Sequence, residues 1–220
     1  MTARQTFEHE LQLLRENLTE MGQLIEQAIE KTLKAFETED EALANEIIQG
    51  DRNINDIEKT IEARCLSLIL KQQPVARDLR IVTTALKVVT DMERIGDHAA
   101  DIAELIMREK RVPIYNLAKH IPEMGRVTKE MVHDSVTAFT TLDVENARAI
   151  VKRDDEVDDL FDRVKEEVAT LLRASNDHVD QCVDILMIAK YFERMGDHAV
   201  NICEWTEFHE TGSVNNIRLL

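Results

Sequence analysis

Two carboxylate-bearing segments have almost the same sequence and lie 100 residues apart. The first reads Glu93-Arg-Ile-Gly-Asp97-His-Ala, and the second reads Glu193-Arg-Met-Gly-Asp197-His-Ala. In each segment a glutamate precedes an aspartate by four residues, a spacing that puts both on one side of a helix. Clustered carboxylate oxygens suit Mg²⁺, Ca²⁺, Mn²⁺ or iron better than soft metals. The pattern therefore indicates two metal sites in a chain made of two copies of one helical unit.

Each glutamate falls in the apolar stripe of its own predicted helix. In the first copy the stripe rises in steps of three and four residues through Leu79, Val82, Leu86, Val89, Glu93 and Gly96. An unpaired carboxylate in such a stripe is costly to bury, and glycine inside a helix costs about 1 kcal/mol relative to alanine. Two copies of this costly arrangement favour a functional site. The alternative is that the acids lie on a solvated or subunit-facing surface and pair with arginine or lysine.

Further oxygen donors are expected on the helix that precedes each motif. Folding back at turns near residues 75 and 175 brings two acid or amide pairs to the level of the motifs. These pairs are Asp51 with Asn55, and Asp154 with Asp158. One turn beyond the motifs, Asp101 and Asn201 could add ligands. Arg94 and Arg194 are expected to point about 100° away from the glutamates before them, so a bound cation would be needed to neutralise each acidic cluster.

Six long helices are expected to position these residues, at about 6–36, 41–71, 77–108, 123–140, 144–172 and 178–209. Pro74 has no N–H and restricts Gln73, so it ends the second helix, and Asp143 is a suitable N-cap for the fifth. Short connections make sequential helices antiparallel. The sequence therefore predicts an all-α protein of two tandem three-helix bundles related by internal duplication, at 1–111 and 123–220, joined by a linker at 112–122.

Composition limits the classes of function and location. The formal net charge of −16 opposes binding to nucleic acid and to anionic lipid, both of which depend on basic side chains. No run of about 18 apolar residues is present, so a membrane role would be indirect, through partners. The three cysteines, Cys65, Cys182 and Cys203, lie far apart and are expected to be buried, reduced thiols of a cytoplasmic protein.

Other chemistries are poorly supported by the sequence. His98 and His198 lie off the apolar stripe and are expected at the surface or in a capping role. Glu130-x-x-His133 has the spacing of di-iron carboxylate bundles but has no second copy. Because no nucleophile elbow or phosphate-binding loop is present, we do not expect an enzyme. A metal-storage or structural helical scaffold and a carboxylate-bridged metalloenzyme remain the alternatives.

With these residues in hand, the chain resembles the PhoU family along essentially its whole length. The resemblance depends on the two acidic motifs and on Gln73-Pro-Val-Ala-Arg-Asp-Leu-Arg80, which opens the third helix. It implies two three-helix bundles, each with an E-x-x-x-D motif that holds metal ions. Asn55 stands where an acid would be expected, and Asn201 stands opposite Asp101 of the first copy. The two metal sites are therefore not expected to be equivalent.

The resemblance also implies a function and partners. Members regulate phosphate homeostasis in the bacterial cytoplasm. Their partners are the ATPase subunit of a phosphate ABC transporter and a phosphate-sensing histidine kinase. They limit uptake and restrain phosphate-starvation signalling when phosphate is plentiful, with no catalytic turnover. The resemblance further implies a homodimer. The metal it implies is a divalent or trivalent ion, with iron, manganese, magnesium, zinc and calcium as the candidates.

Overall fold

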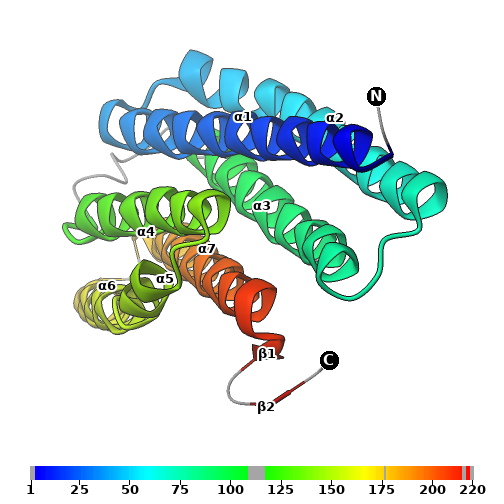
Figure 1. The fold of residues 1–220 in the computed structure, drawn as a ribbon. Helices are drawn as coiled ribbons and strands as arrows, with labels where there is room; N and C mark the ends of the chain where they lie inside the picture. Colours follow the sequence, from blue (N-terminus) through cyan, green and yellow to red (C-terminus); the bar gives the residue numbers. More distant parts are fainter. Residues whose placement is uncertain (1–2, 109–116, 176, 215–216, 219–220) are drawn as a thin grey trace.

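The computed structural model describes residues 3–108, 117–175, 177–214 and 217–218. These residues form seven helices and one two-stranded antiparallel hairpin (Figure 1). The helices are α1 (Ala3–Thr38), α2 (Glu41–Gln72), α3 (Arg77–Arg108), α4 (Ile121–Thr141), α5 (Val144–Val151), α6 (Asp154–Ala174) and α7 (Val179–Thr211), and the strands are β1 (Ser213–Val214) and β2 (Ile217–Arg218). The predicted all-α class and the duplicated helical bundle are confirmed.

The helix ends follow from local chemistry. Gln73 adopts a left-handed conformation with φ of 46° and closes α2 immediately before Pro74. The Asp143 carboxylate accepts a hydrogen bond of 3.0 Å from the backbone N–H of Asn146, so the predicted N-cap of the fifth helix is confirmed. Asp40 caps α2 in the same way, through the N–H of Leu43.

The prediction of one continuous helix over 144–172 is wrong, because the chain turns between Val151 and Asp154 and forms α5 and α6. The Arg153 guanidinium crosses to α4, where it pairs with Asp134 at 3.0 Å and Glu130 at 2.9 Å. Asp154 then opens α6 with acids in its first turn, the end of a helix that favours negative charge. This break puts Asp154 at a helix N-terminus, whereas its counterpart Asp51 lies within α2.

The two bundles share one core. In the first, α1 packs on α2 and α3, and in the second, α4 packs on α5, α6 and α7. The bundles meet along α1 with α4 and along α3 with α7, as Figure 1 shows for the first pair. At Gly125 of α4 the approach is so close that a Cβ atom would lie 2.2 Å from Leu33 Cδ2 of α1. The buried apolar side chains of both bundles, among them Met92 and Phe192, form a single cluster.

The division into 1–111, 112–122 and 123–220 remains a prediction. Residues 109–116, which include the first boundary and much of the linker, lie outside the described residues. The described part of the linker ends with Ile121 and Pro122 already in the first turn of α4. Cys65, Cys182 and Cys203 are buried free thiols, as expected.

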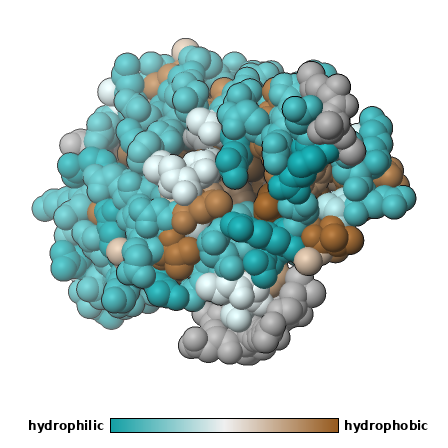
Figure 2. Space-filling view, in the orientation of Figure 1, coloured by the Kyte–Doolittle hydropathy of each residue, from teal (hydrophilic) through white to brown (hydrophobic). Residues whose placement is uncertain are grey.

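The helices α3 and α7 run antiparallel and bring the two acidic motifs to the middle of the molecule. At one end of the pair, Arg80 of α3 donates a hydrogen bond of 3.2 Å to the carbonyl of Glu210 of α7. Near the middle, Asp91 of α3 contacts His198 of α7. The face shown in Figure 2 is mostly hydrophilic, with hydrophobic residues in small patches. No helix among the described residues is both long and apolar enough to cross a membrane.

Candidate functional site

The first acidic cluster combines α2 and α3. Glu93 and Asp97 of α3 face Asp51 and Asn55 of α2, at the level expected from the turn near residue 75. Gly96 permits this approach, because a Cβ atom there would lie 2.9 Å from Ile54 Cδ1 and 3.1 Å from its Cγ2. The glycine that follows Glu93 by three residues is therefore required by close helix packing.

Burial makes this cluster electrostatically costly. It raises the pKa of Asp51 and of Glu93, and the charge of Asp97 raises both further. Asn55 Nδ2 donates a hydrogen bond of 2.8 Å to Asp51 Oδ2. The other side-chain oxygens of this pair, Asp51 Oδ1 and Asn55 Oδ1, are buried and accept no hydrogen bond from any described residue. Two unsatisfied buried oxygens on successive turns are acceptors that a cation would satisfy.

Arg94 neutralises the first motif. Its guanidinium lies 2.9 Å from Asp97 Oδ2 and 3.4 Å from Glu93 Oε2. The expectation that Arg94 points away from the glutamate is wrong for its charged end. The Cα–Cβ bonds diverge by about 100° per residue, but the long flexible side chain reaches back over the helix surface. The arginine pairing that the sequence left as an alternative is therefore present in this half.

The second acidic cluster combines α6 and α7. Asp154 Oδ1 lies 3.2 Å from the position that a Cβ atom on Gly196 would occupy, so Asp154 sits directly over the glycine of the motif. Burial, followed by the charges of Asp158, Asp197 and Glu193, raises the pKa of Asp154 to about 6. Burial and neighbouring carboxylates also raise the pKa of Asp158 and of Asp197. The turn near residue 175 thus brings together the four acids as expected.

A lysine, and no arginine, neutralises the second motif. Lys190 Nζ lies 2.5 Å from both carboxylate oxygens of Glu193 and 5.5 Å from the centre of the Phe161 ring. The equivalent position in α3 is Thr90, whose hydroxyl donates to the carbonyl of Leu86. Arg194 makes no hydrogen bond or ion pair with another described residue, in contrast to Arg94.

Asp101 and Asn201 make contacts outside the acidic clusters, although the charge of Asp101 adds to the burial and the Asp97 charge that raise the pKa of Asp51. Asn201 Nδ2 donates a hydrogen bond of 3.0 Å to Asp91 Oδ1, which also lies 2.8 Å from His198 Nδ1. Asp101 Oδ2 lies 3.4 Å from His98 Nδ1. The structure therefore places both residues at the contact between α3 and α7, and their role as metal ligands stays a prediction.

His98 is buried, so its predicted surface or capping position is wrong. Its ring centre lies 5.3 Å from that of Tyr191 and 5.8 Å from that of His198, between the two bundles. The sequence reading assumed one buried stripe for each helix. Because α3 packs on α7 as well as on α1 and α2, it has a second buried side, and His98 lies there.

Comparison with known proteins identifies the family. The sequence profile of the PhoU domain matches residues 18–106 and again residues 121–206. The chain belongs to the PhoU domain family. A curated PhoU homologue from Clostridium acetobutylicum, named as a phosphate-specific transport system accessory protein, is 40% identical over 95% of this chain and 96% of its own length. The PhoU protein of Escherichia coli K12, with the same accessory name, is 31% identical over 94% of this chain and 86% of its own length.

Solved PhoU structures have the same fold. The crystal structure of the phosphate transport system regulatory protein PhoU from Streptococcus pneumoniae superposes with a TM-score of 0.88 at 28% identity, over 96% of this chain and all of that chain. PhoU from Pseudomonas aeruginosa gives a TM-score of 0.86 at 29% identity, over 94% of this chain. The two PhoU domain matches each contain one complete acidic motif and its facing helix.

The PhoU motifs contain suitable donors for metal, but in an arrangement that must open to receive it. Among the described residues, no three histidine, cysteine, aspartate or glutamate side chains are gathered as a ready coordination group. Arg94 forms an ion pair with Glu93, and Lys190 forms one with Glu193. Breaking these ion pairs would make the two glutamates available to a metal ion. The donor set is all oxygen, as hard cations require, and the unsatisfied Asp51 and Asn55 oxygens fit such an ion.

The sequence analysis missed several members of the PhoU clusters. Lys190 stands three residues before Glu193, a spacing that by itself predicts an ion pair. Glu58, one turn beyond Asn55, lies close enough to Glu93 for its charge to raise the pKa of that carboxyl. Asp91, which holds His198 and Asn201, has Tyr191 at the equivalent position of the second copy. No repeat signal marks it, because its role depends on the contact between the two copies.

Proposed function

We propose that this protein is an accessory regulator of phosphate-specific transport, which negatively modulates uptake by the phosphate ABC transporter and signalling through the phosphate-sensing histidine kinase when phosphate is plentiful. The observation that carries the proposal is the PhoU match over both halves, together with relatives of that name over nearly the whole chain. The partners proposed are the transporter's ATPase subunit and the kinase. The proposal includes a cytoplasmic homodimer and no catalytic turnover.

Metal binding at the two acidic clusters is the second part of the proposal. The residues proposed as ligands are Asp51, Asn55, Glu93, Asp97 and Asp101 in the first half, and Asp154, Asp158, Glu193, Asp197 and Asn201 in the second. The raised pKa of Asp51, Glu93, Asp154 and Asp197 reflects an excess of buried negative charge that a cation would relieve. A bound ion would supply fixed positive charge, and the side chains of this chain would orient it between paired helices.

Complementation tests the regulatory role. A bacterial strain that lacks its own PhoU protein would receive the wild-type chain, the Glu93→Ala/Glu193→Ala variant, or a control with two exposed acids replaced, Glu145→Ala/Asp159→Ala. We expect the wild type and the control to restore low phosphate uptake and low starvation signalling in phosphate-rich medium. A stably produced wild-type chain that restores neither would refute the proposal.

Metal content tests the second part separately. Elemental mass spectrometry on protein purified without chelator would be run on the wild type, on the Glu93→Ala/Asp97→Ala and Glu193→Ala/Asp197→Ala variants, and on the exposed-acid control. We expect each motif variant to lose the metal of its own half while the control keeps both. Metal that binds normally in a chain that fails to regulate would favour the storage alternative. A metal-free wild type of normal stability would mean that the acids serve partner contacts.

A further inference from the structure

An open cavity of about 630 Å³ lies between α3 and α7, at the crossing of the two bundles. Its polar lining comes from both helices and comprises Arg94, His98, Arg194, Asp197, His198 and Asn201. Two of these six are arginines and one is an aspartate, whereas the chain as a whole carries a formal net charge of −16 with histidine neutral. The charged side chains of the lining thus have a small excess of positive charge in an acidic protein.

Two arginines from different helices line the cavity. Arg94 comes from α3 and Arg194 from α7, at equivalent positions of the duplicated motif. Arg194 has no ion pair or hydrogen bond with another described residue, because Lys190 already neutralises Glu193. A guanidinium presents a planar array of N–H donors that matches the oxygens of a phosphoryl group. Arg194 is therefore available to a ligand without breaking an existing pair.

The inner wall of the cavity is held in place by Asp91. Its side chain is only 14% exposed, and its Oδ1 atom receives Asn201 Nδ2 at 3.0 Å and lies 2.8 Å from His198 Nδ1. His98 is buried against Tyr191 on the same contact. Side chains fixed in this way lose little conformational entropy when a ligand binds, which is the usual advantage of a preorganised site.

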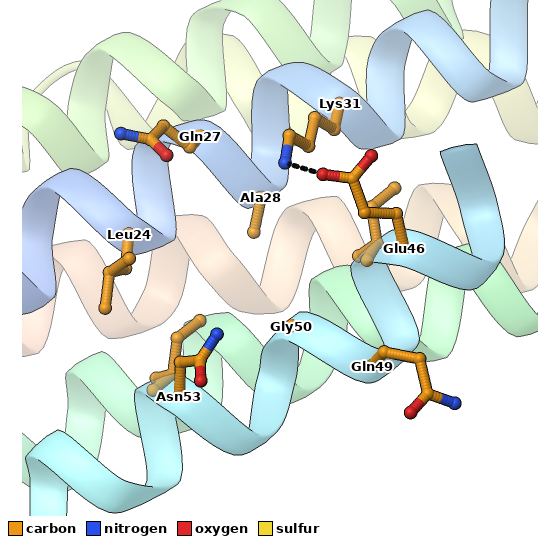
Figure 3. Close-up of a pocket in the computed structure, with 10 residues that line it drawn as sticks. Leu24, Gln27, Ala28, Lys31, Glu46, Gln49, Gly50 and Asn53 are labelled. Carbon is orange, nitrogen blue, oxygen red and sulfur yellow. Dashed lines mark hydrogen bonds and ion pairs between the residues drawn. The ribbon is translucent and has the colours of Figure 1, made fainter. Parts of the chain in front are cut away.

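A second cavity provides a contrast. A groove of about 350 Å³ between α1 and α2 is lined by Gln27, Lys31, Glu46, Gln49 and Asn53, among others (Figure 3). Its one lysine is paired with Glu46 at 2.5 Å. The groove therefore contains amides and a neutralised ion pair, and no free cation that would attract an anion.

We propose that the cavity between α3 and α7 binds the phosphoryl group of a small molecule, with Arg194 and Arg94 as its cationic contacts. The volume lies within the range of about 300–1,000 Å³ that is usual for small-molecule sites. It leaves room for inorganic phosphate and for a larger phosphorylated molecule. The inference does not depend on the proposed regulatory role, because the two guanidinium groups would bind the anion in the isolated protein.

The same geometry couples this cavity to the acidic clusters. Arg94 is shared with Asp97 and Glu93, and Asp197 itself lines the cavity. A phosphoryl group must therefore compete with carboxylates for Arg94 and is repelled by Asp197. A cation on the carboxylates would release Arg94 and remove the repulsion. Since coupling between two sites is reciprocal, metal and phosphoryl ligand would each tighten the binding of the other.

Titration calorimetry with inorganic phosphate and with pyrophosphate tests the site on metal-free protein. The variants are Arg194→Gln and, as a matched control, Arg173→Gln, an exposed arginine in the last turn of α6. We expect saturable binding by the wild type and the control, and at least about tenfold weaker binding by Arg194→Gln, since the variant loses hydrogen bonds from a charged donor to the phosphoryl oxygens. Tighter binding of pyrophosphate would indicate a larger phosphorylated ligand, and equal or tighter binding of phosphate would indicate the free ion.

Two results would overturn the proposal. One is the absence of saturable binding of either probe to folded wild-type protein, and the other is equal weakening by Arg173→Gln and Arg194→Gln. Repeating the titration with Mg²⁺ tests the coupling. Mg²⁺ should raise the affinity of the wild type for phosphate, and it should raise that of Arg94→Gln by a smaller factor. Probe binding by a chain that fails to complement would separate this site from the proposed regulatory function.

Discussion

The two acidic motifs share a sequence but are neutralised in different ways. In the first half, Arg94 bridges Glu93 and Asp97. In the second half, Lys190 holds Glu193, and Arg194 forms no hydrogen bond or ion pair with another residue of the described part of the chain. The residue three positions before the glutamate differs between the halves, since residue 90 is a threonine and residue 190 a lysine. The duplication thus repeats the carboxylates but not the counter-charge, so the two halves are expected to differ in their affinity for cations and for anions.

The facing helices extend this difference. Asp51 lies within α2 and has an amide neighbour, Asn55, which donates a hydrogen bond to it. Asp154 lies at the start of α6 and has a carboxylate neighbour, Asp158, which raises its pKa. The facing helix therefore brings two carboxylates to the second motif and a carboxylate with an amide to the first, and the break between α5 and α6 places Asp154 in the first turn of a helix.

Exchanging residues 90 and 190 should have the largest effect. We expect Lys190→Thr to tighten Mn²⁺ binding to the second half by about tenfold or more, because the lysine competes with the cation for Glu193. Thr90→Lys should weaken Mn²⁺ binding to the first half by a similar factor, and tenfold corresponds to about 1.4 kcal/mol. Equilibrium dialysis would measure this, with Glu93→Ala or Glu193→Ala to silence the other half. Lys34→Thr, at an exposed position of α1, is the control, and an equal shift in that variant would contradict the assignment.

Among the effects on folding stability, the difference between substitutions at residues 91 and 191 should be the largest. Asp91→Ala removes the acceptor shared by His198 and Asn201 and should lower the free energy of unfolding by about 2 kcal/mol, since partly buried donors lose their partner. Tyr191→Phe keeps the ring beside His98 and should change it by less than about 0.5 kcal/mol. Urea denaturation would measure both, with Asp159→Ala as the exposed control. Coincident midpoints for Asp91→Ala and that control would rule out a stabilising role for this contact.

The two motif glycines are the third contrast. In Gly96→Ala the new Cβ meets Ile54 at 2.9 Å, and we expect an overpacking cost that exceeds the gain of about 1 kcal/mol in helix propensity and leaves a net loss of about 1 kcal/mol. In Gly196→Ala the contacts begin at 3.2 Å, and the gain of about 1 kcal/mol in helix propensity should offset them. Thermal and urea unfolding would measure both variants. Ile54→Val should rescue part of the Gly96→Ala loss, and a larger loss in Gly196→Ala would reverse the interpretation.

Local patterns in the sequence predict much of this molecule. The repeat places both motifs, Pro74 ends α2, and Asp143 caps α5, because each depends on chemistry within a few residues. The turn geometry also predicts that Asp51 and Asp154 face the motifs. These features depend only on the helical period and on the positions of the turns, both of which can be read from a single sequence.

Features that depend on several helices at once are not predictable in this way. The burial of His98 follows from the packing of α3 on α7, and the break before Asp154 accompanies the reach of Arg153 to α4. The reach of Arg94 back to Asp97 depends on side-chain length, which a helical wheel of Cβ directions omits. The pairing of Arg94 with the first motif, and the lack of a partner for Arg194 among the described residues, could therefore be established only in three dimensions.

The smallest expected effect concerns Asp154 and pH. A folded-state pKa of about 6, above the ordinary 3.8 of aspartate, means that the folded protein binds this proton more tightly than the unfolded chain. Ionisation of Asp154 therefore costs no stability at about pH 3, where both states are protonated. The cost then grows with rising pH and is complete above about pH 6. The side chain is only partly buried, so solvent screening limits the cost to about 1 kcal/mol.

Replacing the Asp154 carboxyl should remove the destabilisation at high pH, where the carboxyl is ionised, and have no effect at low pH. We expect Asp154→Asn to raise the melting temperature at pH 8 and to leave it unchanged at about pH 3.5. In the first half, the hydrogen bond from Asn55 opposes the rise in the pKa of Asp51, so Asp51→Asn should give a smaller gain at pH 8. Melting curves of both variants and the wild type at the two pH values make the comparison. An equal gain at both pH values would show that Asp154 acts through packing rather than charge, and an equal gain in the two halves would remove the electrostatic difference between them.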